Sequence, residues 1–428
     1  MISRNSVRII TTLITVALPL EWYTHRGMRM LTRAWPQARK RRVRQSYWAL
    51  MAGLSGSLLV TLRLFHKQHR MNAFGKTTIN LTLTMLTTKQ TFVLVLLGGD
   101  IFRVLIATGR FLREKGRGEV SSSFRLPERR KQMSQAALAV ASVPFVSFLY
   151  GITRGKYDFR VHRSVLYFDD LPEAFDGFTI TQLSDIHAGS FDLSSRKAVQ
   201  RGVDLAQAQE SDLFLFTGDL VNNLAEEIGP WLDVFGQLRA PYGQFSTLGN
   251  HDYGEYISWP SEAAKAADLE QLMQYHKVLG YQLLNNTHVM LEKDGQQLAL
   301  LGVENWGTGF IQRGDLDAAL AGVDKSAFKV LMSHDPSHWE EKVKNHPTRV
   351  QLTLAGHTHG MQMGVELPGW MPGWKWSPIQ YRYPHWAGLA EVNRRQLYVN
   401  RGFGFLGFSG RVGIWPEVTV LELRRKEG

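Results

Sequence analysis

The stretch Gly356-His357-Thr358-His359-Gly360 follows the apolar run of residues 350–355. Such a run predicts a β-strand, and the flanking glycines let the backbone turn sharply where the strand ends. We therefore expect both imidazoles to be exposed at the end of a strand. Neighbouring imidazoles are typical metal ligands, yet paired histidines in a turn are about as often structural. The interpretation depends on carboxylate and amide partners elsewhere in the chain.

Four other strand-like runs end in residues of these types. The runs cover residues 178–183, 213–216, 245–248 and 328–332, and the residues that follow them include Asp185, His187, Asp219, Asn250, His251 and His334. In open α/β sheets, sites form in the crevice beyond the carboxyl ends of the strands. The five clusters are therefore expected to converge, although they lie far apart in the sequence.

The ordered set Asp-x-His, Gly-Asp, Gly-Asn-His-Asp, His and Gly-His-x-His resembles the calcineurin-like metallophosphoesterase superfamily, over residues 167–423. The resemblance implies an α/β fold of two packed mixed β-sheets flanked by helices, with two bound metal ions. It implies that one ion is held by Asp185, His187, Asp219 and His359, and the other by Asp219, Asn250, His334 and His357. His251 would then be the catalytic residue that stabilises the phosphate or protonates the leaving oxygen.

The chemistry gives an independent reason for this mixture of ligands. Hydrolysis of a phosphoester needs neutralised phosphoryl oxygens and a hydroxide at neutral pH, and two metal ions about 3.5–4 Å apart supply both. Nitrogen and oxygen ligands suit manganese, iron, zinc, cobalt or nickel, and the absence of cysteine excludes thiolate sites. Taken singly, Asp185 or Asp219 would more often cap a helix and Asn250 would more often form a turn. Asp252 and Asp335 either orient His251 and His334 or cap the segments that follow.

Charge is distributed unevenly along the chain. Residues 1–163 contain 28 Lys and Arg against 6 Asp and Glu, whereas residues 164–428 contain 22 against 32. The formal net charge of +12 therefore combines +22 in the first part with −10 in the second. Nucleic acid is not expected as a partner, because tracking a phosphate backbone needs a basic surface on the part that carries the site.

The basic first part also contains four apolar segments, at residues 9–23, 47–62, 91–108 and 136–152. They predict about four transmembrane helices in a membrane region of residues 1–153, followed by a catalytic domain of residues 154–428. Four buried helices of a soluble domain are the alternative, which the Arg-rich connections argue against. Asp100 and Arg103 lie three apart in the third segment, so they could pair with each other or face the bundle interior.

The basic residues also predict an orientation. The first and third connections carry eight Lys and Arg each and the second carries five, so the first and third should face the cytoplasm. The prediction is a multi-pass protein of the plasma (inner) membrane with an extracytoplasmic catalytic domain. The run Arg154, Lys156, Arg160 and Arg163 after the last segment argues against this assignment.

Two later segments have more than one interpretation. Residues 367–376 contain three tryptophans and two Pro-Gly-type breaks, and they predict a loop that lines a substrate cleft, dips into the membrane interface or closes the core. Arg401 and Arg411 either offer guanidinium groups to a phosphate or form salt bridges.

Within the superfamily, the chain looks most like bacterial integral-membrane phosphodiesterases and UDP-2,3-diacylglucosamine pyrophosphatases. Membrane anchoring and the tryptophan loop lead us to expect a phosphodiester or pyrophosphate substrate linked to a lipid or to the envelope. Three alternatives stay open: a UDP-2,3-diacylglucosamine-type pyrophosphatase in lipid A synthesis, a transporter or sensor bundle with an appended hydrolase, and a metal-binding scaffold without turnover.

Overall fold

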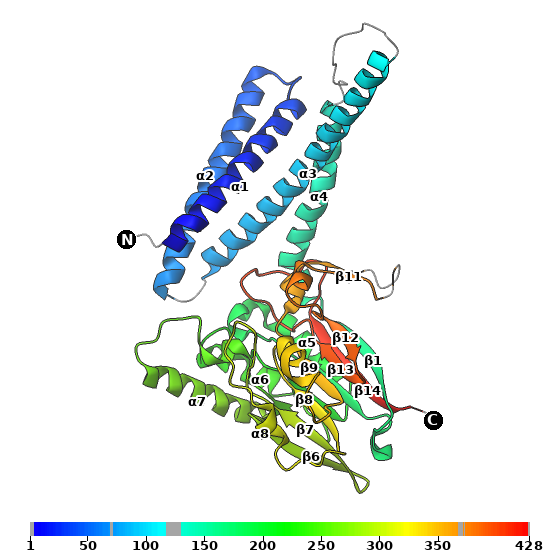
Figure 1. Cartoon of the computed structure of the whole chain (residues 1–428). Helices are drawn as coiled ribbons and strands as arrows, with labels where there is room; N and C mark the ends of the chain where they lie inside the picture. Colours follow the sequence, from blue (N-terminus) through cyan, green and yellow to red (C-terminus); the bar gives the residue numbers. More distant parts are fainter. Residues whose placement is uncertain (1–3, 69–71, 117–129, 367–370, 372, 427–428) are drawn as a thin grey trace. The chain divides into compact units, whose positions relative to one another are not determined.

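The computed structural model of the chain describes residues 4–68, 72–116, 130–366, 371 and 373–426, with side chains described for residues 18–64, 72–113, 131–366, 371 and 373–426. The chain divides into two compact units, Met1–Tyr150 and Gly151–Gly428 (Figure 1). We call them the helical unit and the sheet unit, and each is described by itself.

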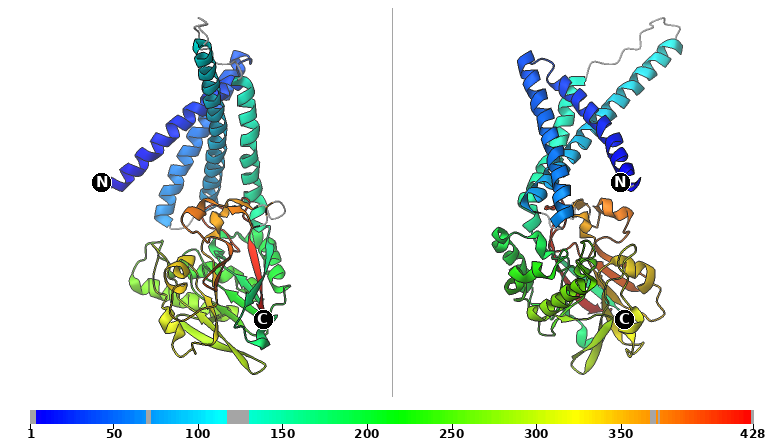
Figure 2. Two further views of the ribbon diagram at one scale, coloured as in Figure 1. Left: turned by 45° about the vertical axis from the view of Figure 1, so that its right-hand side comes forward. Right: turned by 90° about the vertical axis from the view of Figure 1, so that its left-hand side faces the viewer.

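The helical unit is built from four helices: α1 (Arg4–Leu31), α2 (Gln37–Gln68), α3 (Ala73–Gly116) and α4 (Arg130–Thr153). Consecutive helices run in opposite directions, so α1 ends, α2 begins, α3 ends and α4 begins at one end of the unit (Figures 1 and 2). Phe92 and Leu96 of α3 pack on Ala137 and Ala141 of α4, and Tyr23 of α1 joins this small core. The helix ends that border the two Arg-rich connections therefore lie at the same end of the unit.

Three of the described helices are long and apolar enough to cross a membrane, over Gln37–Leu64, Ala73–Arg113 and Lys131–Thr153. They contain the second, third and fourth predicted apolar segments. Most of the first predicted segment lies before Leu18, where side chains are outside the described residues, so that span stays a prediction. Large apolar side chains such as Leu94, Leu105 and Val143 are exposed, as expected for surfaces that meet lipid.

The third span is much longer than the predicted residues 91–108. Helix α3 begins well before this segment because threonines in its first half bond to the helix itself. The hydroxyl groups of Thr84 and Thr88 each donate to the carbonyl oxygen four residues earlier, at 2.7 Å. Such bonds satisfy the hydroxyl inside a helix, so polar side chains do not end it.

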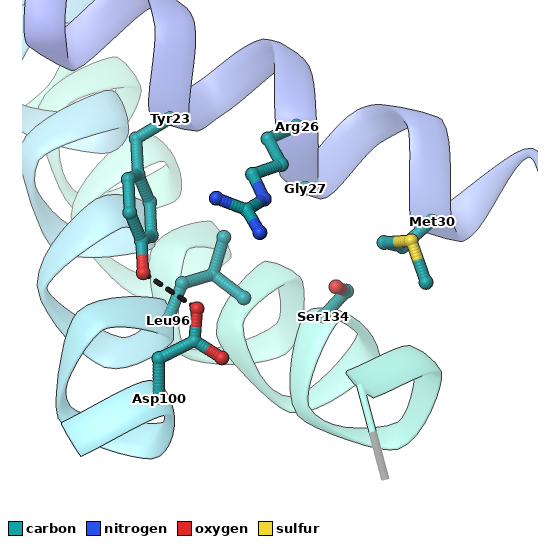
Figure 3. Close-up of a pocket in the computed structure, with 7 residues that line it drawn as sticks. All are labelled: Tyr23, Arg26, Gly27, Met30, Leu96, Asp100 and Ser134. Atoms are coloured by element: carbon teal, nitrogen blue, oxygen red, sulfur yellow. Dashed lines mark hydrogen bonds between the residues drawn. The ribbon is translucent and has the colours of Figure 1, made fainter. Parts of the chain in front are cut away.

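Ionisable side chains pair inside the helical unit. Arg103 Nη1 lies 2.8 Å from Asp100 Oδ1, which confirms the expected pair, and the hydroxyl of Tyr23 donates to Asp100 Oδ2 at 2.6 Å. Figure 3 shows Asp100 and Tyr23 in a small pocket between α1, α3 and α4. A second group joins Lys89 and the hydroxyl of Tyr47 to the Glu21 carboxylate. Pairing of this kind lowers the cost of ionisable groups in apolar surroundings.

The sheet unit contains two six-stranded mixed sheets. The first has the order β1 (Arg160–Phe168), β14 (Glu417–Arg425), β2 (Thr179–Leu183), β3 (Leu213–Phe216), β4 (Gln244–Ser246) and β5 (Gln282–Leu283). The second has the order β12 (Gly388–Val392), β13 (Arg395–Val399), β9 (Leu352–Ala355), β8 (Phe328–Met332), β7 (Gln296–Gly302) and β6 (Thr287–Lys293). Strands β2, β3, β4 and β5 are parallel, as are β7, β8, β9 and β13.

The two sheets pack face to face. Ile180, Leu213 and Leu215 of the first sheet share one buried core with Val330 and Leu354 of the second. All of these central strands are buried on both faces, and β3, with the sequence Leu-Phe-Leu-Phe, is apolar throughout. The expected fold of two packed mixed sheets flanked by helices is therefore confirmed.

Helices cover the outer faces. Helices α5 (Arg196–Gln207), α6 (Leu232–Phe235) and α7 (Glu262–Leu279) lie on the first sheet, and α8 (Leu316–Leu320) and α9 (Pro336–His338) lie with the second. The hydroxyl of Ser261 accepts from the backbone N–H of Ala264 at 3.1 Å and so caps the start of α7. A two-stranded ribbon, β10 (Val365–Glu366) with β11 (Lys375–Trp376), completes the unit.

Candidate metal centre

Five loops bring the predicted residues together. They leave the carboxyl ends of β2, β3 and β4 in one sheet and of β8 and β9 in the other. Five of the predicted ligands have left-handed backbone conformations: Asp185, His187, Asp219, His357 and His359, with φ between 48° and 70°. Non-glycine residues rarely adopt this region, and such strain concentrates at functional sites.

Two glycines allow the loops to approach each other. A Cβ atom on Gly218, which has φ of 95°, would lie 2.6 Å from the backbone nitrogen of Gly249. A Cβ atom on Gly356 would collide with Ser184 Oγ and the Asp185 carboxylate. The Gly-Asp and Gly-His-x-His patterns therefore have a steric reason: no other side chain fits where these loops meet.

Six side chains form two groups, each compact enough to hold a metal ion. The first is Asp185, His187 and His359, and the second is Asp219, His334 and His357; within each group the potential ligand atoms all lie within 4.8 Å of one another. All are buried except His357, which is half-buried. Asp219 lies between the groups, because its Oδ2 atom is 3.2 Å from His334 Nε2 and 3.4 Å from His187 Nε2.

Three Nε2 atoms of these groups face other potential ligand atoms instead of ordinary hydrogen-bond partners. His187 Nε2 and His359 Nε2 face each other at 3.0 Å, and the buried Nε2 of His334 has no hydrogen-bond partner among the described residues. Converging imidazole nitrogens and carboxylate oxygens form a donor set that suits borderline divalent ions. The residues therefore fit a dinuclear metal site.

Outer partners fix the imidazole rings. His334 Nδ1 lies 2.7 Å from the carbonyl oxygen of Thr217, which leaves Nε2 to face Asp219. His357 Nδ1 lies 2.8 Å from Asn250 Oδ1, while its Nε2 lies 2.9 Å from the Tyr383 hydroxyl and 3.4 Å from Asp335 Oδ2. Asn250 therefore stands beside the second group, with a carboxylate on the far side of the His357 ring, an arrangement that orients metal-binding histidines.

Similarity to known protein families agrees with this geometry. The family model of the calcineurin-like phosphoesterases matches residues 178–361, and a second family model, described as "Probable Calcineurin-like phosphoesterase, transmembrane domain", matches residues 7–156. The chain is a calcineurin-like metallophosphoesterase with a transmembrane domain. It is thus a hydrolase anchored in the membrane, with a buried dinuclear His/Asp site.

Relatives of this metallophosphoesterase occur in bacteria and vertebrates. It is 28% identical over 261 residues to "Uncharacterized metallophosphoesterase YkuE" of Bacillus subtilis (strain 168), an alignment that covers 59% of this chain and 82% of the relative. It is 27% identical over 297 residues to "Phosphodiesterase YaeI" of Escherichia coli (strain K12), covering 69% and 98%. A "Transmembrane protein with metallophosphoesterase domain" of Danio rerio is 24% identical over 345 residues, covering 78% and 71%.

The electrostatics of the metallophosphoesterase site favour cations. Burial alone lowers the pKa of His334, but the Asp219 carboxylate outweighs burial and raises this pKa to about 10. Burial also opposes ionisation of Asp185 and Asp219, yet the neighbouring histidines hold both pKa values below the ordinary value. At neutral pH both carboxylates are therefore anionic and the His334 ring is protonated on both nitrogens. Only the neutral ring would offer a lone pair to a metal ion.

His251 lies beside the two groups. Its ring centre is 5.0 Å from that of His187, and its backbone N–H donates to Asp219 Oδ1 at 2.9 Å. Its Nδ1 atom lies 2.7 Å from the carbonyl oxygen of Asn222. Burial lowers its pKa to about 4. The ring is thus fixed through one nitrogen, which leaves Nε2 for a substrate.

Asp252 and Asp335 do not orient the histidines next to them in the sequence, and Asp335 caps the segment that follows it, as the alternative interpretation expected. Asp252 accepts the backbone N–H groups of Gly249, Asp219 and Leu220 at 2.8 to 2.9 Å, so it joins two ligand loops instead of orienting His251. Asp335 caps Ser337 at 2.8 Å and orients His357 rather than His334. Sequence proximity therefore does not decide which histidine a carboxylate orients, because each of these carboxylates reaches a different loop.

Arg401 and Arg411 are structural, so the idea that they bind phosphate is wrong. Arg401 pairs with Glu417 at 2.6 Å and Glu366 at 2.8 Å. Arg411 is fully buried and donates to the carbonyl oxygens of Arg401, Gly402 and Gly404. These donors hold the loop that packs behind His359 and leave no free face for a substrate.

Aromatic residues near the site were not predicted from the sequence. Tyr383 contacts His357 through its hydroxyl, the Phe310 ring packs edge-on to His357 at 4.8 Å, and the Tyr256 ring lies 4.5 Å from that of His251. Single aromatics in loops carry no recognisable pattern. They give the site an aromatic lining, and Arg382 lies 5.7 Å from the Phe310 ring.

Proposed function

We propose that this metallophosphoesterase hydrolyses a phosphodiester or pyrophosphate bond in a lipid- or envelope-linked substrate. The observation that carries the proposal is the pair of ligand groups that meet at Asp219, with His251 beside them. In this assignment Asp185, His187, Asp219 and His359 hold one ion, and Asp219, Asn250, His334 and His357 hold the other. When bound, the two ions supply charge neutralisation and a hydroxide at neutral pH.

His251 is assigned as the general acid. Its Nδ1 is held by the Asn222 carbonyl at 2.7 Å, so a protonated ring can give up the Nε2 proton to the leaving oxygen. The anionic substrate favours that protonated form, because it brings negative charge next to the ring. Tyr383 and Asp335 keep His357 in place while the substrate binds.

A direct test compares three substrates with the full-length chain in detergent and added manganese. We expect turnover of bis-p-nitrophenyl phosphate and of hexadecyl p-nitrophenyl phosphate, and less of the monoester p-nitrophenyl phosphate. Hydrolysis of the soluble monoester alone, without preference for a diester or for the acyl-like chain, would refute the substrate assignment.

We further propose that the sheet unit lies on the extracytoplasmic side. The support is that the helix ends bordering both Arg-rich connections lie at one end of the helical unit, and the last helix leads away from that end. The chain has no cysteine, so a single Val278→Cys, exposed on α7, reports topology. Labelling by a membrane-impermeant maleimide in intact cells is expected. Protection until permeabilisation would place the site in the cytoplasm and favour the UDP-2,3-diacylglucosamine-type pyrophosphatase.

A second function, in transport or sensing, is favoured by the paired ionisable residues of the helical unit. Asp100 pairs with both Arg103 and Tyr23 at a depth where charges are costly. If this pair has such a function, Asp100→Asn will abolish the cellular phenotype of the chain while hydrolysis by the purified variant stays unchanged. Equal loss of both would make the pair structural.

A further inference from the structure

Exposed apolar side chains of the sheet unit concentrate in one short stretch. Of the thirteen large apolar residues that are exposed in the described part of this unit, seven lie between residues 361 and 389. We call these seven the aromatic ledge: Met361, Val365, Met371, Trp374, Trp376, Tyr381 and Leu389. The others are scattered singly, which is normal for a protein surface, whereas a grouped patch marks an interaction site.

The ledge belongs to the end of the sheet unit that carries the β10–β11 ribbon, away from the β6–β7 hairpin (Figures 1 and 2). Val365 and Trp376 are paired in the ribbon, and Lys375 reaches the carbonyl oxygen of Ala387, just before Leu389. Tyr381 ends the short helix Pro378–Tyr381 that follows and is 81% exposed. These contacts hold Val365, Trp376 and the segment that leads to Leu389 next to one another.

The ledge lies close to the point where the chain enters the sheet unit. Gly151, near the end of the candidate span Lys131–Thr153, accepts from the backbone N–H of Arg411 at 3.2 Å. The next residue, Val412, donates to Gln362 at 2.8 Å and accepts from Gly364 at 2.9 Å, and Gly364 leads directly into β10. Three such pairs of neighbouring segments, each roughly 5 Å apart, and two single-residue steps along the chain connect Gly151 to Trp376.

Basic side chains flank this entry point. Arg154 is exposed, Lys156 lies 4.9 Å from the Phe405 ring, and Arg160 lies 5.1 Å from the Trp415 ring. Cations beside tryptophans match the layer of a bilayer where lipid phosphates meet the acyl chains. By the loop-charge rule, the basic residues after the last span argue against an extracytoplasmic sheet unit. Contact with anionic lipid headgroups would explain these basic residues on either side of the membrane.

The ledge also reaches the metal centre. Tyr381 is two residues from Tyr383, whose hydroxyl lies 2.9 Å from His357 Nε2. Met361 is two residues from His359. Two residues of extended chain span at most about 7 Å, so a headgroup held at the ledge would have its phosphate near the ligands.

From these observations we propose that the aromatic ledge seats the sheet unit on the headgroup layer of the lipid bilayer. The occupant of this surface is the membrane in which the chain is anchored, since the span ends beside it and the side chains are those of a membrane interface. If the chain has the proposed hydrolase function, the ledge would let a phosphodiester in a lipid headgroup enter the site without leaving the bilayer.

Because the chain lacks cysteine, single spin labels can test the ledge directly. Trp374→Cys and Tyr381→Cys are placed in full-length chain reconstituted in phosphatidylcholine–phosphatidylglycerol vesicles, with exposed Val278→Cys on α7 as the matched control. We expect the ledge labels to collide more with oxygen and less with an aqueous nickel chelate than the control label. Ledge labels that are as accessible to the nickel chelate as the label at residue 278 would overturn the proposal.

A second measurement asks whether the ledge delivers substrate. Trp374→Ser with Trp376→Ser is compared with Val278→Ser on hexadecyl p-nitrophenyl phosphate in phosphatidylcholine vesicles and on soluble bis-p-nitrophenyl phosphate. Each tryptophan would bury apolar surface in the bilayer interface, so its removal weakens membrane binding. We therefore expect the rate on the vesicle substrate to fall by about tenfold or more, and the rate on the soluble substrate to stay unchanged. An equal loss on both substrates would refute delivery, as would no loss. If the unmodified chain hydrolyses neither substrate, the hydrolase assignment fails while the spin-label result still decides the ledge.

Discussion

Replacing Asp219 by Asn tests the idea that one carboxylate serves both metal positions. The substitution keeps the shape of the side chain and removes its charge. Asp219 Oδ2 lies 3.2 Å from His334 Nε2 and 3.4 Å from His187 Nε2, and these nitrogens belong to different ligand groups. Both ions should therefore lose affinity, unlike the effect of removing a ligand of one group.

The size of the loss follows from these distances. An ion bound at either nitrogen lies within about 4 Å of the carboxylate, where a unit charge and a divalent cation attract each other by ~8 kcal/mol at an effective dielectric constant of ~20. If the amide dipole and water recover half of this, about 4 kcal/mol per ion is lost. That loss weakens each dissociation constant by roughly a thousandfold.

The assay counts metal after dialysis of the full-length chain against buffered manganese that just saturates the unmodified protein. We expect two ions per chain for the unmodified protein and for the control Asp233→Asn, whose exposed carboxylate pairs with Arg196. We expect fewer than one ion for Asp219→Asn, with an unchanged thermal transition once metal is added in large excess. Two ions bound to Asp219→Asn with unchanged affinity would refute the shared carboxylate.

Three further predictions follow from the site and its support. His251→Ala should slow hydrolysis of alkyl phosphodiesters by about 10²–10⁴-fold yet barely affect hydrolysis of bis-p-nitrophenyl phosphate, because a good leaving group needs no proton. His346→Ala is the control variant. Equal effects of His251→Ala on both substrates would exclude His251 as the general acid. Tyr383→Phe should weaken metal binding by about tenfold in a manganese titration, since it removes the hydroxyl 2.9 Å from His357 Nε2, whereas exposed Tyr381→Phe should not; matching titrations would contradict this role. Burial opposes ionisation of Glu417, but Arg401 lowers its pKa to about 2, below the unfolded value of 4.5. The pair therefore stabilises the fold fully above pH 4.5, and the free energy of unfolding should fall by about 2 kcal/mol between pH 5 and 3. Thermal unfolding of Glu417→Gln with the same pH slope as the unmodified chain would disprove this contribution.

The candidate ligands could be predicted from the sequence because each of them follows a run of residues that predicts a strand. An apolar run such as residues 213–216 is buried on both faces and can be recognised in the sequence. The end of the run predicts the end of a parallel strand, and the polar residues that follow are expected at the site. The left-handed conformation of Asp185 and the steric need for Gly218 are consequences of that convergence. Order and residue type were therefore sufficient to place all seven ligand candidates and His251 in one site.

Contacts between loops could not be read in the same way. For Asp335 the sequence left two roles open, orienting His334 or capping the next segment. The carboxylate caps Ser337 and lies 3.4 Å from His357, which follows another strand of the same sheet. Arg401 and Arg411 have sequence contexts that suit anion binding, yet Glu417 and three backbone carbonyls occupy them. Such assignments depend on which loops pack together, which hydrophobic periodicity does not encode.

The extent of the long helix was also underestimated. Hydropathy located the apolar centre of α3, but the Thr-rich turns before it remain helical through hydroxyl bonds to the preceding turn. A sequence rule that ends a span at the first polar cluster misses this local compensation.

Metal titration of the chelator-treated, full-length chain tests the central claim most directly. Hydrolysis of bis-p-nitrophenyl phosphate and bound metal are measured on the same samples as manganese is added. Our account predicts no turnover in the stripped protein and a plateau that is reached only when two ions are bound per chain. Full activity in the stripped protein, or two bound ions without turnover, would contradict a dinuclear phosphoester hydrolase.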